Sequence, residues 1–314
     1  LAAGLGSDDL RITGGTAKNV TVLVKKKAGK LTVAGEGAVE KLAASAAGYA
    51  ISEGAGKFTL GDGKIQLKDA SLLLNNQKIT AAGTITPADN DMKLNLDLAA
   101  AAFDPGALAA MPLRGAMAFQ AKLEGTVANP VARGTFSIPA GSFGAIAFKN
   151  GRGNFVYQSG VLTLADARAT AWDGALALQG DIVPATKRYN LTASGRGVDS
   201  ELLTEKDIRG RADFDARLSG QGESDGKAEG NFRMGEGLFS GIPFQSMTGD
   251  FVKKGEQISF SNIVVNTAAG SFRAEGLTDG PVVRLKRLGE APAPREAVEK
   301  AISDKLNPLK RIFR

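Results

Sequence analysis

A unit of about 96 residues occurs more than once in this chain, and this repetition limits the folds open to it. Residues 134–180 align without a gap to residues 230–276 at a shift of 96 positions. The alignment holds 11 identical pairs in 47 positions, where roughly three or four are expected by chance. Most of the identical residues are glycine or phenylalanine: Gly134/Gly230, Phe136/Phe232, Gly141/Gly237, Phe143/Phe239, Ile146/Ile242, Phe148/Phe244, Gly153/Gly249, Phe155/Phe251, Val156/Val252, Gly174/Gly270 and Gly180/Gly276.

An earlier copy lies one residue further away, at a shift of 97. Its matches include Gly56/Gly153, Phe58/Phe155, Leu67/Leu164, Asp69/Asp166, Gly83/Gly180 and Leu94/Leu191. We therefore predict three β-repeats, at residues 1–111, 112–206 and 207–288, followed by a basic tail at 289–314.

Apolar and polar residues alternate inside each copy, which is the period of a half-buried strand. Leu94, Leu96 and Leu98 interleave with polar residues, as do Ile65 and Leu67. Turn-forming pairs separate these runs: Asp62-Gly63, Asn150-Gly151, Ser159-Gly160, Asp173-Gly174 and Lys254-Gly255. Such pairs accept the positive φ angles of tight hairpins. The sequence thus predicts an all-β fold, an antiparallel meander with minor helices.

Three short helices are expected where the copies end. They are Asp104–Met111, Asp199–Lys206 and a tail helix at about 295–306. In the tail, Val298, Ile302 and Leu306 follow helical spacing, and the basic pair Lys310 and Arg311 comes shortly after. This tail has two interpretations: an amphipathic helix that docks on anionic lipid headgroups, or a solvated cap over the last strand.

Composition excludes most catalytic chemistry. The chain has no Cys and no His, so thiolate nucleophiles, His bases and His-ligated metals are absent. The carboxylates do not cluster. We therefore expect no enzyme, no cofactor and no metal site, with an Asp/Glu-based polysaccharide-cleaving enzyme as the least favoured alternative.

The net charge of +6 is concentrated near the end of the chain. Residues 281–314 hold nine Lys/Arg against four acids, so the rest of the chain is nearly neutral. A nearly neutral body is not typical of a nucleic-acid-binding protein.

An antiparallel meander with one apolar face must cover that face. A barrel or a sandwich has a fixed size, whereas an open trough grows as units are added. We therefore favour an elongated sheet curled into a groove. A solenoid also grows by repetition and remains an alternative, although its repeats usually run at roughly 20–50 residues.

The pattern of strand, glycine and polar turn resembles the AsmA/TamB superfamily of bacterial envelope proteins. The residues that carry the resemblance are Gly115–Phe119 through Gly125, Asn129-Pro130 with Ala132–Phe136, the second copy at Gly210–Gly220 with Glu229–Phe232, and Asn307-Pro308-Leu309 before Lys310-Arg311. These motifs are degenerate and glycine-driven, and the similarity runs from about residue 30 to the end.

The resemblance implies a taco-like β-groove in the periplasm, anchored in the inner membrane by an N-terminal helix absent from this chain. It also implies that the groove carries phospholipid acyl chains between the inner and outer membranes. Its implied partners are phospholipid, the membrane surface and an outer-membrane barrel assembly protein. The far C-terminal strand region typical of TamB is not found in this sequence, which counts against the barrel partnership.

The apolar residues expected to line such a groove come from all three copies: Ile65, Leu67, Leu94, Leu96, Phe136, Phe143, Phe148, Phe155, Leu162, Leu164, Phe214, Leu218, Phe232, Phe239, Phe244, Phe251, Ile258 and Phe260. The competing interpretation is a self-filled core, because aromatic stripes are more often core. That interpretation corresponds to a structural or assembly β-solenoid that assists the insertion of outer-membrane proteins.

Some residues that resemble functional motifs are interpreted as structural. Asp69, Asp166 and Asn262 share one repeat position and are expected to form turns at strand ends. Gly35-Glu36-Gly37 and Gly195-Arg196-Gly197 lack the strand–helix context of a phosphate-binding loop and are also expected to be turns. Trp172 has no match in the other copies.

Overall fold

The computed structural model describes residues 10–27, 30–46, 49–88, 91–106, 113–144, 146–203, 208–222, 225–239, 242–254, 257–275 and 284–288. Almost all of these residues are in β-strands. Every strand pairing given with its register is antiparallel. The predicted all-β, antiparallel fold is therefore confirmed.

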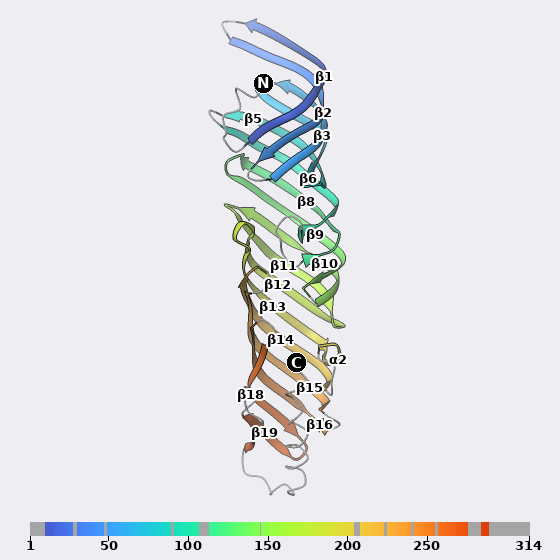
Figure 1. Cartoon of the computed structure of the whole chain (residues 1–314), viewed down its shortest axis with the longest axis vertical. Helices are drawn as coiled ribbons and strands as arrows, with labels where there is room; N and C mark the ends of the chain where they lie inside the picture. Colours follow the sequence, from blue (N-terminus) through green and yellow to red (C-terminus); the bar gives the residue numbers. More distant parts are fainter. Residues whose placement is uncertain are drawn as a thin grey trace. The chain divides into compact units, whose positions relative to one another are not determined.

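The chain divides into two compact units. Unit 1 comprises residues 1–143, 150–165 and 183–185. Its strands appear in blue to green in Figure 1 and are β1 (Leu10–Lys27), β2 (Lys30–Ala46), β3 (Tyr49–Gly61), β4 (Lys64–Leu74), β5 (Gln77–Ala88), β6 (Asp91–Phe103), β7 (Leu113–Arg114), β8 (Met117–Thr126) and β9 (Pro130–Phe143).

Unit 2 comprises residues 144–149, 166–182 and 186–314. Its strands are β13 (Arg188–Asp199), β14 (Ile208–Gln221), β15 (Asp225–Phe239), β16 (Ile242–Phe244), β17 (Ser246–Lys254), β18 (Gln257–Thr267), β19 (Gly270–Glu275) and β20 (Arg284–Leu288). Three strands contribute residues to both units: β10 (Ile146–Gln158), β11 (Val161–Ala171) and β12 (Gly174–Val183).

Within each unit the strands follow one another as a meander. In unit 1, β1 to β6 pair in chain order, and β8 pairs with β6 and β9. In unit 2, β13 to β15 and β17 to β20 do the same. Two short strands depart from this order, because β7 pairs with β9 and β16 with β15. The four-part division predicted from the repeat is not tested by these units and stays a prediction.

The prediction that one shared repeat position forms turns at strand ends is wrong. Asp69, Asp166 and Asn262 lie inside β4, β11 and β18, not at strand ends. Each has a positive φ, of 50°, 50° and 52°. The strand register shifts around Asp69 and Asn262, so these residues form β-bulges. A short polar side chain tolerates this left-handed conformation, which explains the residue type without any catalytic role.

The predicted turns are partly correct. Asp62-Gly63 and Ser159-Gly160 both have positive φ between consecutive strands. The turn expected at Asp173-Gly174 instead uses Trp172-Asp173, with φ of 50° and 53°, and Gly174 begins β12. This assigns Trp172 to a left-handed turn position. Gly255 of the Lys254-Gly255 pair lies outside the described residues.

Three glycine-containing segments expected to be turns lie inside strands instead. Asn150-Gly151 is within β10, where Asn150 has a φ of 55°. Gly35–Gly37 is part of β2 and Gly195–Gly197 part of β13. The last segment spans a register shift between Gly195 and Val198. Glycine alone does not separate a bulge from a turn, since both require unusual backbone angles.

Little of the described chain is helical. The helix α2 covers Ser200–Leu203, the first half of the predicted Asp199–Lys206 segment, and residues 204–207 lie outside the description. Most of the predicted Asp104–Met111 helix and the whole tail helix, with Val298, Ile302, Leu306, Lys310 and Arg311, also lie outside it.

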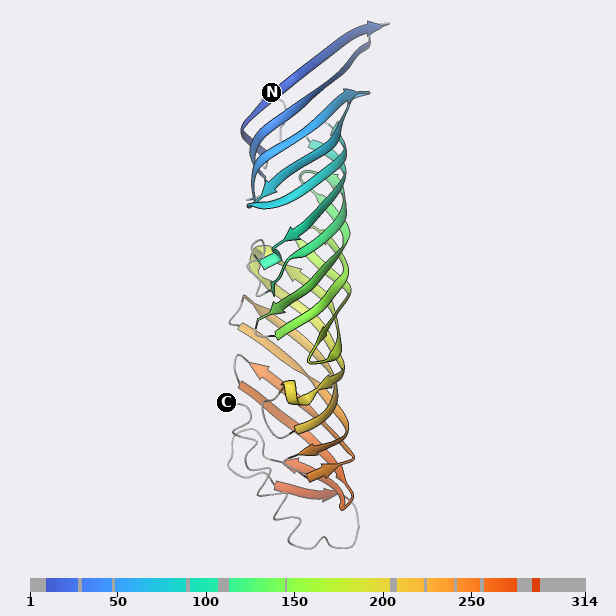
Figure 2. The ribbon, with the colours of Figure 1, turned by 90° about the vertical axis from the view of Figure 1, so that its right-hand side faces the viewer.

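Glycine allows the sheets to curl. Figure 2 shows the strands bending along their length. A Cβ on Gly134 would stand 2.2 Å from the Gln120 carbonyl oxygen, and one on Gly230 would stand 2.1 Å from that of Asp215. No larger residue permits so close an approach between neighbouring strands. Such glycines allow a sheet to bend over its apolar face.

Candidate functional site

Two rows of apolar residues cross the sheet of unit 1 from strand to strand. Residues directly opposite each other on paired strands point to the same face. One row, which we call the Ile85 row, consists of Val22, Gly35, Leu60, Ile65, Ile85, Leu94, Gly125 and Pro130, each the register partner of the next. It therefore runs over eight strands, from β1 to β9.

A second row lies two residues further along each strand, on the same face. This Leu96 row consists of Gly37, Phe58, Leu67, Gly83, Leu96, Leu123 and Ala132. Together the two rows bring the predicted residues Ile65, Leu67, Leu94 and Leu96 onto one face. We call this surface the apolar face of unit 1.

Aromatic side chains continue the apolar face toward β10. Phe119 on β8 is the register partner of Phe136 on β9. Its ring meets Phe103 edge-on at 5.4 Å between centroids and Phe155 at 6.4 Å. Edge-to-face contacts of this kind add stability beyond the burial of area.

Unit 2 has a comparable aromatic group. Phe214 on β14 pairs with Phe232 on β15, and Phe251 on β17 pairs with Phe260 on β18. The rings of Phe232 and Phe260 meet edge-on at 6.0 Å. Leu218 lies on the same face as Phe214, opposite Leu191 on β13. The predicted residues Phe214, Leu218, Phe232, Phe251 and Phe260 are thus gathered on one face.

Several phenylalanine rings lie against a glycine of the neighbouring strand. The pairs in register are Gly37–Phe58, Gly195–Phe214, Gly249–Phe232 and Gly237–Phe244, and a Cβ on any of these glycines would be within 2.8 Å of the ring. Because the glycine has no side chain, the ring can lie along the sheet and does not have to project from it. The ring therefore covers the sheet surface with carbon.

The apolar face of unit 1 is neither a closed core nor a free surface. Ile65, Leu67, Leu94 and Phe136 are half-buried, while Leu96 is buried. Among the described residues, strand backbones approach mainly their sheet neighbours, with α2 beside β14 and β16 beside β18. A row of half-exposed apolar side chains can accept an apolar ligand.

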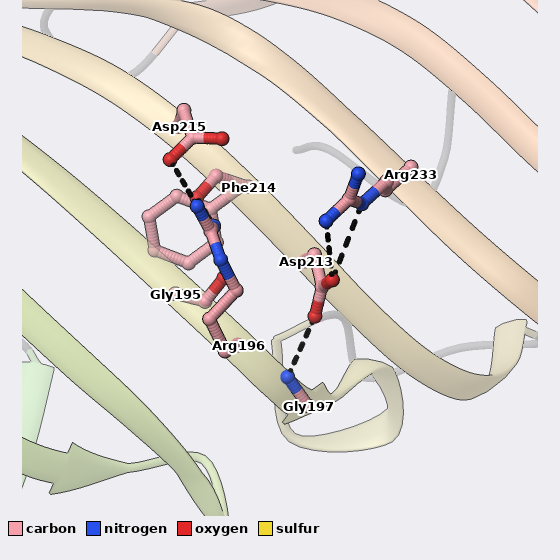
Figure 3. A network of polar contacts seen from close by, with 7 residues as sticks. All are labelled: Gly195, Arg196, Gly197, Asp213, Phe214, Asp215 and Arg233. Carbon is pink, nitrogen blue, oxygen red and sulfur yellow. Dashed lines mark hydrogen bonds and ion pairs between the residues drawn. The ribbon is translucent and has the colours of Figure 1, made fainter.

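Charged residues occupy the opposite face of unit 2 (Figure 3). Asp213 and Asp215 alternate with Phe214 along β14 and so point away from it. Arg196 donates to Asp215 at 2.6 Å and to the Phe214 carbonyl at 2.7 Å. Asp213 accepts from the Gly197 N–H at 2.8 Å and from Arg233 at 3.2 Å. These contacts tie the bulge of β13 to β14 and β15.

This network lowers one pKa. The hydrogen bond from the Gly197 N–H is the main reason that the pKa of Asp213 lies below its usual range. Desolvation is the next largest effect and opposes it, while the hydrogen bond and the charge of Arg233 lower the pKa further. The carboxylate is therefore an acceptor that stays ionised, which is unlike a general acid. The hydrogen-bond partners of Asp213 indicate that its role is structural.

The structure places most of the remaining predicted lining residues on other strands. Phe143 pairs with Leu113 of β7, and Phe148, Leu162 and Leu164 are half-buried on β10 and β11. Phe244 is buried against Gly237. Phe239 and Ile258 belong to β15 and β18, but their side chains lie outside the described part of the chain.

Sequence reasoning missed several residues of the same surface. Phe58, Phe103, Phe119 and Leu123 belong to it by register or ring contact. Phe119 and Phe214 occupy corresponding places, each opposite a repeated phenylalanine, Phe136 or Phe232. Their separation of 95 residues falls outside the gapless 96-residue alignment. Allowing a one-residue gap would have found them.

The described residues hold no cluster of potential metal ligands and no buried side-chain N or O atom without a partner. No described helix is long and apolar enough to cross a membrane. Comparison with known protein families, with curated proteins and with solved structures finds no match to this chain.

Proposed function

We propose that this chain is a non-enzymatic protein of the bacterial envelope whose apolar β-face shields phospholipid acyl chains between the inner and outer membranes. The observation that carries the proposal is the pair of half-exposed apolar rows in unit 1. The resemblance to the AsmA/TamB superfamily supplies the periplasmic location, the inner-membrane anchor and the role in outer-membrane biogenesis.

The dimensions of the rows suit an acyl chain. The Ile85 row crosses eight strands, and seven spacings of about 4.8 Å give roughly 34 Å. One leaflet contributes about 15 Å to the hydrocarbon core of a bilayer. Each CH₂ group removed from water stabilises the complex by about 0.8 kcal/mol, so shielding ten of them contributes about 8 kcal/mol. No covalent chemistry is needed for this function.

The proposal includes the tandem repeat, because a groove built from copies keeps its face continuous as it grows. Nearly equal φ angles at Asp69, Asp166 and Asn262 support it. So does the close approach to the facing strand at Gly134 and Gly230, which are 96 residues apart.

A second candidate is a β-protein with a self-filled core that assists the insertion of outer-membrane proteins. Unit 2 favours it, because Ile182, Leu191, Val198 and Phe272 are at most 2% exposed. In that case the apolar face is closed by the chain's own side chains and no lipid enters.

Site-specific photo-crosslinking separates the two candidates. A benzophenone amino acid replaces Leu94, which is half-buried on the apolar face, or Asn95, the next residue on β6 and exposed on the opposite face. The chain is mixed with phosphatidylethanolamine/phosphatidylglycerol vesicles and irradiated. Mass spectrometry then detects any phospholipid adducts. Phospholipid adducts at Leu94 but not at Asn95 support the acyl-chain groove. Absence of adducts at both positions, with the same protein free of co-purified lipid, rejects it in favour of the self-filled core.

A further inference from the structure

The first strand of unit 1 has a free edge with an unusual surface. Among the described residues, the strand register and the close backbone approaches of β1 are with β2. Beyond its bulges, β1 stays in unbroken register with β2 from Thr21 to Lys27. Here Val22, Leu23 and Val24 are 52%, 50% and 59% exposed. A straight, apolar strand edge of this kind is a ready template for another strand.

Both faces of this segment are apolar. Val22 and Val24 point to the apolar face of unit 1, since Val22 pairs with Gly35 of the Ile85 row and Val24 is two residues on. Leu23 points to the other face. An added strand would therefore have apolar neighbours on both faces of the sheet, and main-chain hydrogen bonds would hold it.

The charge of β1 selects the partner. Its charged residues are all basic, namely Arg11, Lys18, Lys25, Lys26 and Lys27. Lys18 forms an ion pair with Glu40 of β2 at 2.5 Å, and no ion pair involves Arg11, Lys25 or Lys26 among the residues that the structure describes. Two unpaired lysines thus end the apolar segment, one on each face.

A second copy of the chain is a poor occupant. Antiparallel pairing of β1 with β1 over the full strand sets Arg11 against Lys26, and like charges across strands destabilise a sheet. Pairing with β20 gives the same conflict, because the charged residues of that strand are Arg284, Lys286 and Arg287. Strands within the sheet differ, as β14 holds Asp213 and Asp215 beside its arginines.

We propose that the free edge of β1 at Val20–Lys26 binds, by strand addition, an extended segment of a partner protein that carries acidic residues among apolar ones. The apolar residues would cover Val22, Leu23 and Val24, and the carboxylates would meet Lys25 and Lys26. The basic charge both attracts this partner and prevents the chain from stacking on itself. The proposal does not depend on lipid binding.

The test uses a fluorescein-labelled peptide in which valine and threonine alternate with glutamate, and a second peptide with lysine in place of each glutamate. Fluorescence anisotropy with the full chain is expected to give at least tenfold tighter binding of the acidic peptide. This preference falls as NaCl rises from 0.05 to 0.5 M, with screening lengths of roughly 14 Å and 4 Å. Hydrogen exchange is expected to slow at residues 20–26.

A matched pair of variants controls for net charge. Lys25→Glu/Lys26→Glu is expected to reverse the peptide preference. Lys57→Glu/Lys68→Glu makes the same change in net charge on β3 and β4, away from the edge, and is expected to retain it. Equal binding of both peptides, or slowed exchange outside residues 20–26, overturns the proposal. So does a dimer in sedimentation that protects residues 20–26 without peptide, which identifies a second copy as the occupant.

Discussion

The ring of Phe214 on β14 lies across Gly195 on β13, so close that a Cβ on Gly195 would stand 2.2 Å from Cε1 of the ring. On the other side of β13, Arg196 and Gly197 hydrogen-bond to Asp215 and Asp213. One bulge therefore serves both faces of the sheet. It seats an aromatic ring on the apolar face and fixes a charged network on the opposite face.

This contact predicts a cost for a single methyl group at Gly195. Gly195→Ala forces the Phe214 ring to move, and overpacking of this kind destabilises a protein by about 1–3 kcal/mol. The control is Gly235→Ala on β15, where a Cβ meets nothing within 4 Å. There alanine is expected to stabilise the chain by up to about 1 kcal/mol, because it restricts the unfolded state. Urea unfolding measures both.

The Phe214→Ala background identifies the cause. If the ring is the obstacle, Gly195→Ala costs less there than in the native chain, which a double-mutant cycle reports as coupling. An unchanged cost would assign the effect to the backbone of the bulge.

The bulge in β4 predicts an unusual order of substitutions at Asp69. Its φ of 50° is left-handed, a conformation that costs most side chains roughly 1–2 kcal/mol. Asp69→Gly is expected to leave the free energy of unfolding within about 0.5 kcal/mol of the native value. Asp69→Val is expected to lower it by about 1–2 kcal/mol.

The neighbouring residue provides the reference for this series. Lys68→Val, at an exposed position of the same strand with ordinary φ, is expected to change stability by less than about 0.5 kcal/mol. Thermal unfolding of the three variants gives the order. A valine tolerated equally at 68 and 69 would contradict the assignment of a strained bulge at Asp69.

The strands were predictable because period-two alternation is a local property. Leu94, Leu96 and Leu98 on β6, and the alternating residues of β14, lie on the faces that the pattern indicates. The choice between turn and bulge was not predictable. Asp62 and Asp69 are the same residue type with nearly equal positive φ, yet one is in a hairpin and the other inside a strand. Only the pairing of β3, β4 and β5 separates them, and pairing is a long-range property.

The apolar face was predicted in part. Repetition drew attention to Phe136 and Phe232, whose register partners are Phe119 and Phe214. A gapless alignment does not identify Phe119, because its counterpart Phe214 is displaced by one residue. Nor could it indicate that Val198 is fully buried, since this depends on the bulge that precedes it.

The lowered pKa of Asp213 predicts a pH-dependent contribution to stability. A group whose pKa is depressed on folding stabilises the folded state above its unfolded pKa, near 3.9, and loses that contribution as the pH falls through the folded pKa. At pH 7, Asp213→Asn is expected to cost up to about 1 kcal/mol, because the pair with Arg233 is partly exposed. Urea titrations at pH 7, 4.5 and 3 should show the difference between native chain and variant shrinking below pH 4.

Glu236→Gln serves as the reference for this titration. Glu236 is exposed on β15, and its variant is measured at the same three pH values. A gap between Asp213→Asn and the native chain that persisted at pH 3 would mean that shape, and not ionisation, accounts for the effect.

The two faces of β6 give the most direct prediction about lipid. Leu94→Asp places a charge on the apolar face, whereas Asn95→Asp adds the same charge one residue away on the exposed face. If acyl chains lie along the Ile85 row, Leu94→Asp lowers the phospholipid bound per chain at least tenfold, because a carboxylate would be desolvated beside hydrocarbon. Asn95→Asp leaves it unchanged. Native mass spectrometry counts the bound lipid, and circular dichroism shows that both variants retain their strands. Equal loss of bound phospholipid in the two folded variants would contradict acyl-chain binding on this face. The added charge, and not its position, would then account for the loss.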